Sequence, residues 1–77
     1  MRWMQRIPVQ SSVLLAVAYD PADRVFEAEF HNGQVYQYHR VPPELYQQLL
    51  TAESLGSFFN RKIRNHFPYR PLAARSA

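Results

Sequence analysis

The chain has 77 residues, of which 47% are hydrophobic and 14% aromatic, so it has room for one core and is too apolar for a disordered protein. It contains no cysteine, which excludes disulfides and thiolate metal sites and fits a cytoplasmic location. The formal net charge of +3 indicates an anionic partner rather than a cationic one.

The positive charge is gathered in the last third of the chain. All six carboxylate side chains lie between residues 11 and 53, in a stretch that holds two arginines. Residues 54–77 have no carboxylate side chain and carry five cations: Arg61, Lys62, Arg64, Arg70 and Arg75. This asymmetry predicts that an anionic partner meets the C-terminal segment.

The N-terminal region has the outline of a secretory signal, because Arg2 and Arg6 precede an apolar stretch that ends in Ala16-Val17-Ala18. Pro8 and the polar residues 10–12 interrupt that stretch, so we expect no signal. No window approaches the roughly 20 apolar residues of a membrane span, and we expect no membrane association.

Three strands are predicted in the first half of the chain. Residues 12–19 form a nearly all-apolar run, which is typical of a short strand covered on both faces. The turn residues Asp20-Pro21-Ala22-Asp23 follow, and then strands over 24–30 and 34–41. The residues before Val9 are a candidate for an additional short edge strand.

The turn between the second and third strands decides which side chains share a face. A two-residue loop at Asn32-Gly33 would pair Phe30 with Val35 and mix carboxylates with tyrosines. A three-residue loop, with His31 added and Gly33 left-handed, pairs Phe30 with Gln34 instead. We expect the second register, because it separates an aromatic face from a water-facing one. The aromatic face holds Phe26, Ala28, Phe30, Tyr36 and Tyr38, and the water-facing side holds Glu27, Glu29, Gln37 and His39.

Two helices are predicted after the strands. Proline suits the first turn of a helix, so the first helix begins near Pro43 and runs to Ala52. Ser54 is the expected N-cap of a second helix over residues 55–65. The first helix buries Leu45, Leu49 and either Leu50 or Ala52. The second buries Leu55, Phe59, Ile63 and His66 and turns Ser57, Arg61, Arg64 and Asn65 to solvent.

After Pro68 we expect an extended segment to Leu72 and a disordered tail over residues 73–77. The predicted fold class is therefore α+β: a small antiparallel three-stranded β-meander followed by two α-helices packed on one face. Residues 1–72 form a single domain.

An ordered series of short signals resembles the KTSC domain, which is named for its occurrence at the C-terminus of some lysyl-tRNA synthetases. The signals are Pro8-Val9-Gln10-Ser11-Ser12, Tyr19-Asp20, Phe30 with Gly33, Tyr36-Gln37-Tyr38, Val41-Pro42, Tyr46, Ala52, Ser54, Gly56, Phe59-Asn60, Ile63-Arg64 and Phe67. The resemblance covers residues 7–70. It implies a short stand-alone bacterial domain of undetermined function for which RNA binding has been suggested.

The residues that favour nucleic-acid binding lie on the second predicted helix and beyond it. Arginine and lysine neutralise phosphates, and arginine also binds them bidentately. Tyr36 and Tyr38 are read as core residues, whereas Phe58 is placed at the border of the helix and offers a platform for base stacking. The candidate nucleic-acid site is Phe58, Asn60, Arg61, Lys62, Arg64 and Arg70.

Catalytic and metal sites are not predicted. The three histidines have no ligand spacing, so we expect no metal and no cofactor. Ser11 and Ser12 lack the surroundings of a nucleophile and are expected to bond to the backbone at the start of the first strand. His31 is assigned to a turn. The chain is therefore expected not to be an enzyme.

The leading hypothesis is weak binding of RNA by the basic face of the last helix. If about four cations meet phosphate, the logarithm of affinity falls with that of salt concentration with a slope near −3. A second hypothesis is a protein-interaction module, in which an exposed sheet edge pairs with a partner or a second copy of the chain. A third is a hydrolase that acts on nucleic acid.

Overall fold

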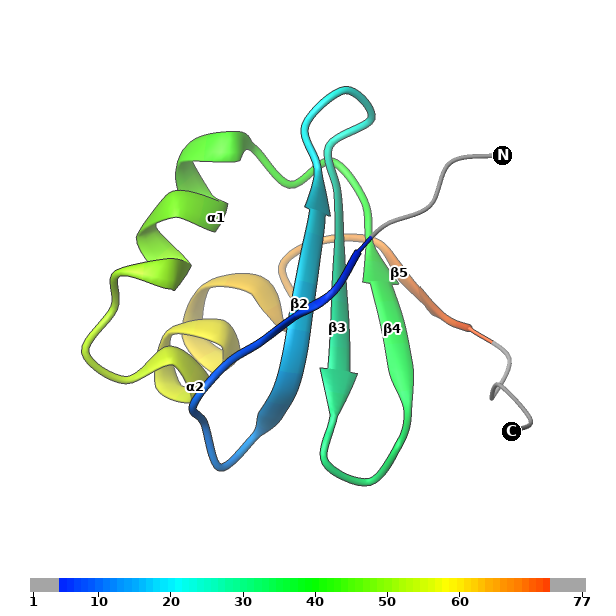
Figure 1. Cartoon of the computed structure of the whole chain (residues 1–77). Coiled ribbons are helices and arrows are strands. Elements are labelled where there is room, and N and C mark those ends of the chain that lie inside the picture. Colours follow the sequence, from blue (N-terminus) through cyan, green and yellow to red (C-terminus); the bar gives the residue numbers. More distant parts are fainter. Residues whose placement is uncertain (1–4, 73–77) are drawn as a thin grey trace.

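The computed structural model describes residues 5–72 as one antiparallel sheet with its helices on one side (Figure 1). The strands follow one another in the sheet in the order β1-β2-β3-β4-β5, and the helical segments lie between β4 and β5. The elements are β1 (Ile7–Pro8), β2 (Leu14–Asp20), β3 (Val25–Phe30), β4 (Val35–Tyr38), α1 (Pro43–Leu50), α2 (Leu55–Phe58), the π-helix η1 (Phe59–Ile63) and β5 (Tyr69–Pro71).

The α+β class is confirmed, but the expected count of three strands is wrong, because the sheet has five. The first additional strand is the candidate edge strand before Val9, which is confirmed, and the second is the segment after Pro68, which was expected to be extended but not to join the sheet. Each is too short for an alternating pattern to identify it as a strand. Both pair with long strands, β1 with β2 and β5 with β4. The tail expected over residues 73–77 lies outside the described residues.

The hairpin between β3 and β4 has the register that the sequence predicted. The Phe30 N–H donates to the Gln34 carbonyl at 2.8 Å, and the Gly33 N–H donates to the Phe30 carbonyl at 2.9 Å. Gly33 has a φ of +92°, in the left-handed region that glycine adopts without steric cost. The three-residue loop is therefore confirmed, and it places Tyr36 opposite Ala28 and Tyr38 opposite Phe26.

Both helices begin where the sequence predicted. The first helix, α1, begins at Pro43 and ends at Leu50, two residues earlier than expected. Its inward residue Leu49 is fully buried, and of the two alternatives Ala52 packs against the core while Leu50 is exposed. The Ser54 hydroxyl caps α2 by accepting from the Ser57 N–H at 3.3 Å.

The second predicted helix differs from an α-helix in its last part. After one α-helical turn the chain continues as the π-helix η1, in which the Arg64 N–H donates to the Phe59 carbonyl at 2.9 Å. The wider turn lets Phe58, Phe59 and Ile63 all enter the core. The helix therefore does not reach Asn65, which adopts a φ of +68° in the turn after η1.

The core lies between the helices and the helix-facing side of the sheet. Phe59 contacts the rings of Phe26, Phe30 and Tyr38 at centroid distances of 6.2, 5.6 and 5.6 Å. The fully buried side chains include Leu14, Val17, Phe26, Val41, Leu49, Phe59 and Ile63. Tyr38 is a core residue as expected, with 2% of its surface exposed.

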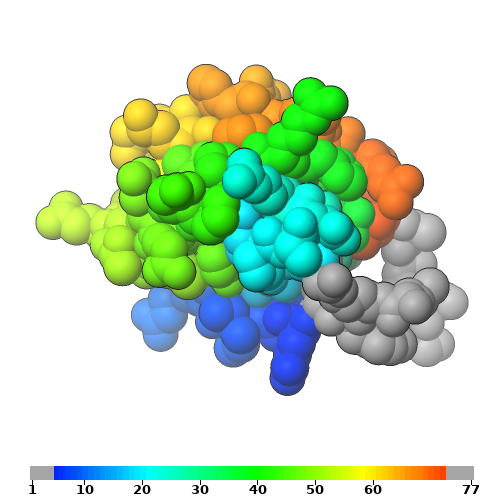
Figure 2. All heavy atoms as spheres, turned by 90° about the horizontal axis from the view of Figure 1, so that it is seen from above, coloured from blue at the N-terminus to red at the C-terminus, as the bar shows by residue number. Residues whose placement is uncertain are grey.

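The opposite side of the sheet carries a charged cluster where water-facing side chains were expected. Arg6, just before β1, forms ion pairs with Glu27 and Glu29, and Gln37 donates from Nε2 to Glu27 Oε1 at 3.2 Å. The expectation that Glu27 faces water is wrong, because these partners leave it 5% exposed. Figure 2 shows the last helix and the segment after it, yellow to orange, on the side of the molecule opposite β1, dark blue.

Among residues 5–72, no helix has the length and apolar content that crossing a membrane requires.

Candidate nucleic-acid interface

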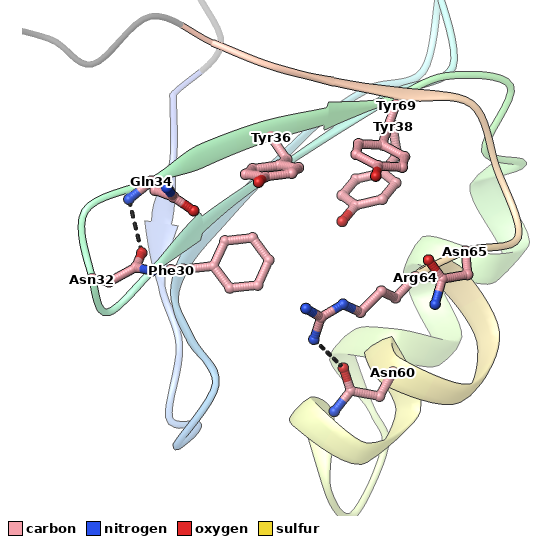
Figure 3. Close-up of a pocket in the computed structure, with 9 residues that line it drawn as sticks. All are labelled: Phe30, Asn32, Gln34, Tyr36, Tyr38, Asn60, Arg64, Asn65 and Tyr69. Atoms are coloured by element: carbon pink, nitrogen blue, oxygen red, sulfur yellow. Dashed lines mark hydrogen bonds between the residues drawn. The ribbon is translucent and has the colours of Figure 1, made fainter.

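A pocket of about 540 Å³ opens between the hairpin end of the sheet, β5 and the end of η1 (Figure 3). This volume lies within the range of small-ligand sites in proteins. Aromatic side chains line one part of it and amides with one arginine line the other. The lining residues are Phe30, Asn32, Gln34, Tyr36, Tyr38, Asn60, Arg64, Asn65 and Tyr69.

Three tyrosines from β4 and β5 form the aromatic wall. The β4–β5 register places Tyr69 opposite Tyr38, and directly paired residues of antiparallel strands project to the same face. The rings of Tyr36 and Tyr69 stack with centroids 5.5 Å apart and planes at 23°, and the ring of Tyr38 lies 5.5 Å from that of Tyr69. Tyr69 is 51% exposed, so the wall presents an aromatic surface to solvent as well as to the pocket.

The polar wall comes from η1 and the turn after it. The Arg64 side chain extends from the end of η1 toward Phe30, across the pocket from the tyrosine rings (Figure 3). Its Nη1 donates to Asn60 Oδ1 at 3.2 Å, which fixes the guanidinium at this position. Both side chains are exposed, so the positive charge of Arg64 remains available to a ligand.

The β3–β4 hairpin closes one end of the pocket. Asn32 Oδ1 accepts from the Gln34 N–H at 3.0 Å, the local bond by which asparagine stabilises turns. The ring of Phe30 meets that of Tyr36 edge-on, with centroids 5.6 Å apart. The three-residue loop therefore places an amide and a phenyl ring beside the tyrosines.

The charge of Arg64 acts on the aromatic wall. Burial raises the pKa of Tyr38 to about 12, and the nearby Arg64 guanidinium counteracts this rise by favouring the phenolate. Tyr38 therefore remains neutral throughout the physiological range, and its hydroxyl can both donate and accept a hydrogen bond.

Of the six residues predicted for the site, Asn60 and Arg64 line the pocket. Arg61 and Lys62 do not line it but are exposed on the same helix. The other two, Phe58 and Arg70, lie elsewhere. Phe58 is 9% exposed and belongs to the core, so its expected place at the solvent border is wrong. The reason is the π-turn, which directs Phe58 and Phe59 inward together.

Arg70 lies on the other face of the sheet and does not continue the basic face of the helix. It pairs with Gln37, whose side chain bonds to Glu27 in the charged cluster behind the sheet. Because directly paired residues share a face, Arg70 projects to that cluster and Tyr69 projects to the pocket. Arg75, the remaining C-terminal cation, lies outside the described residues.

Sequence reasoning missed Tyr69, Phe30, Asn32, Gln34 and Asn65 as pocket residues. It read Tyr36 and Tyr38 as core residues, but both also line the pocket and Tyr36 is only half-buried. An extended segment after Pro68 was predicted, and its two-residue period would have placed Tyr69 and Arg70 on opposite faces. The pairing of that segment with β4 was the missing step. His66 is also misplaced by the helical pattern, since it is exposed in the turn after η1.

The lining of the pocket is aromatic and amide-rich, with one arginine. The described lining contains no carboxylate, histidine or thiol side chain.

As expected, the Ser11 hydroxyl bonds to the backbone at the start of β2, accepting from the N–H groups of Val13 and Leu14 at 3.0 and 3.1 Å. His31 lies in the hairpin turn, where its Nε2 is 2.7 Å from the Ser11 carbonyl oxygen.

Comparison with known proteins identifies the family. A sequence model of the KTSC domain matches residues 10–67. An uncharacterised protein of Stutzerimonas stutzeri is 45% identical over 67 residues, which are 86% of this chain and 94% of that protein. A lysine–tRNA ligase of Nostoc sp. is 31% identical over 64 residues, which are 83% of this chain and 11% of the ligase.

A solved structure shows the same fold. The crystal structure of a KTSC domain protein from Yersinia pestis superposes with a TM-score of 0.87 at 40% sequence identity, covering 91% of this chain and 99% of that one. The family model and these relatives agree with the resemblance found in the sequence, which is thereby confirmed. The chain belongs to the KTSC domain family.

Proposed function

We propose that the domain is a non-catalytic module that binds single-stranded RNA at the pocket between η1 and the β4–β5 wall. One observation carries the proposal: the Arg64 guanidinium, held by Asn60, lies opposite stacked tyrosine rings in an open pocket. An aromatic surface beside a fixed cation is the combination that single-strand binding proteins use, because bases stack while phosphates are neutralised.

The aromatic wall supplies the stacking surface. Every base has a π-face, so stacking on tyrosine is tolerant of sequence and contributes roughly 1–3 kcal/mol per base. Tyr69 is 51% exposed and Tyr36 half-buried, so both present ring surface to a ligand without leaving the sheet. The base-stacking role proposed for Phe58 from sequence therefore passes to these tyrosines.

The cations at the end of η1 supply the positive charge that attracts the RNA backbone. Arg61, Lys62 and Arg64 lie within four consecutive residues, and all three are exposed. With Arg70 on the opposite face, three cations remain on the RNA-binding side, so the expected salt slope becomes about −2. The charged cluster behind the sheet contains Glu27 and Glu29, which would repel a phosphate chain from that face.

RNA is favoured over DNA by the relatives. Lysine–tRNA ligases act, by their name, on a transfer RNA, and a segment related to this chain makes up 11% of the one from Nostoc sp.. The domain would serve there as an additional RNA-binding surface, a role that this chain would perform alone.

The sheet-edge hypothesis has less support. The edge strands β1 and β5 are two and three residues long, and each contains a proline, Pro8 and Pro71. Short edges with proline resist pairing with another strand, because proline has no N–H to donate. The hydrolase hypothesis is likewise weaker, because the described pocket lining has no carboxylate or histidine to act as a general base.

The proposal is tested by titrating a short fluorescently labelled single-stranded RNA with the protein at several salt concentrations. The expected dissociation constant is roughly 10⁻⁴ to 10⁻⁶ M near physiological salt, with a slope of about −2. Arg61→Glu is expected to weaken binding about tenfold, because it removes one phosphate contact and adds a repulsion.

Arg70→Glu is the matched control, since it changes net charge equally on the opposite face. It is expected to change affinity less than about threefold, because charges farther apart than about 8 Å are largely screened at physiological salt. Circular dichroism confirms that both variants fold. Equal losses from the two substitutions would show that bulk charge, rather than the pocket face, attracts RNA.

A further inference from the structure

We infer that the pocket reads a guanine base, in preference to adenine, through the Arg64 guanidinium. The inference rests on the proposed function and adds base selectivity to it. It depends on which hydrogen-bonding groups of the pocket are fixed as donors and on where those groups lie relative to the stacking surface.

The hydrogen bonds within the pocket fix two amides by chemistry. An arginine can only donate, so the Asn60 atom that receives the bond from Arg64 Nη1 must be its oxygen. A backbone N–H can likewise only donate, so the Asn32 atom that receives the bond from Gln34 must also be its oxygen. Each amide therefore has an oxygen engaged within the protein and an NH₂ group remaining as a donor.

Arg64 adds the strongest donors. Its guanidinium carries five N–H groups in a planar fork, and Asn60 engages one nitrogen of it. The described lining contains no aspartate or glutamate, the side chains that accept without donating when ionised. The guanidinium and the two amide NH₂ groups are therefore donors, and they favour a ligand that presents acceptors to them.

Of the two purines, guanine presents the acceptor pair that the fork requires. Its O6 and N7 atoms are adjacent acceptors on one edge and match the arginine fork bidentately. Adenine places its N6 amino group, a donor, where guanine has O6. Facing Arg64, that amino group would meet N–H groups instead of an acceptor.

The stacking surface and the fork line one pocket, so a single base in it can meet both. The tyrosine rings project from β4 and β5, and the Arg64 guanidinium lies across the pocket from them, beside Phe30 (Figure 3). In the inferred complex, the base packs against the tyrosine wall and its O6–N7 edge meets the fork. The cavity volume of about 540 Å³ accommodates a ligand of nucleotide size.

The test compares RNAs of about eight uridines, within the site sizes of single-strand modules, in which one central position is guanine, adenine or uracil. Uracil is the neutral background because its N3–H donor separates the O2 and O4 acceptors. One guanine cannot form a quadruplex, so differences in affinity report the base itself. The guanine RNA is expected to bind about tenfold more tightly than the adenine RNA, within the range for one bidentate contact. In Arg64→Lys, which keeps the charge and loses the fork, this ratio is expected to fall to about one while the salt slope is unchanged.

Three results would overturn the inference, and they separate it from the proposed function. Equal binding of all three RNAs by the unaltered protein would remove guanine selectivity and leave RNA binding intact. A preference for guanine that survives Arg64→Lys in full would show that Arg64 does not read the base. Binding of none of the RNAs, by protein shown to be folded by circular dichroism, would overturn both the selectivity and the proposed function.

Discussion

Gly56 of α2 packs closely against the residues just before β2, and adding one methyl group there tests how firmly α2 is seated. A Cβ atom at Gly56 would lie 2.9 Å from Ser11 Oγ, 2.9 Å from Val13 Cγ2 and 3.2 Å from Val13 Cβ. Neither neighbour can move easily. Ser11 Oγ accepts two backbone hydrogen bonds, and Val13 is β-branched and stiff at χ1.

The expected cost follows from two opposing terms. Overpacking of this kind costs roughly 1–3 kcal/mol, whereas replacing a helical glycine with alanine gains at most about 1 kcal/mol. We therefore expect Gly56→Ala to lower the free energy of unfolding by about 1–2 kcal/mol. For a domain of this size, that corresponds to a fall in Tm of roughly 4–16 °C.

Urea unfolding monitored by circular dichroism measures this cost, and Ser57→Ala in the same turn is the control. Ser57 is exposed and adds no atoms on substitution, so a change within about 0.5 kcal/mol is expected. In a Val13→Ala background, Gly56→Ala is expected to cost less, with a coupling of at least about 0.5 kcal/mol. A Gly56→Ala protein as stable as the parent would refute the close approach of α2 to β2.

Three further results are expected. Ultraviolet titration should show one tyrosine with a pKa of about 12, and this tyrosine should be absent in Tyr38→Phe. Because folding favours the neutral phenol of Tyr38, this group stabilises the fold fully below about pH 10, and that stabilisation is lost as pH rises through about 12. A uniform tyrosine titration near pH 10 would contradict the burial of Tyr38. Arg64→Gln should raise the pKa of Tyr38 further, and an unchanged value would place Arg64 elsewhere. Arg6→Ala should lower the free energy of unfolding in urea by about 1–3 kcal/mol, because it leaves Glu27 buried without its cation. Adding Glu27→Gln to Arg6→Ala should restore part of that loss. An Arg6→Ala protein as stable as the parent would contradict the ion pair.

The elements with strong local signals were predictable from sequence. Gly33 requires a left-handed turn, and the alternation on either side of it is consistent with one register, so the hairpin face could be identified. Pro43 and Ser54 marked the starts of both helices for similarly local reasons, the fixed φ of proline and the capping hydroxyl.

The remainder depended on tertiary contacts that a local pattern does not encode. The π-turn forms because Phe58, Phe59 and Ile63 gain burial together, and a regular helical period cannot represent that change. Long-range pairing of three-residue β5 with β4 decides that Tyr69 faces the pocket and Arg70 faces away. Of the nine residues that line the pocket, only Asn60 and Arg64 were therefore predicted as site residues from the sequence, and the aromatic wall was not.

Amide chemical-shift mapping with a single-stranded RNA tests the central claim most directly, because it reports binding and its location together. The account predicts shifts concentrated at the hairpin, at Asn60 to Asn65 and at Tyr69, with small changes in β1 and at Gln37 behind the sheet. Shifts concentrated around Arg6, Gln37 and Arg70, or no shifts at RNA concentrations near 10⁻⁴ M, the weak end of the expected dissociation constants, would contradict it.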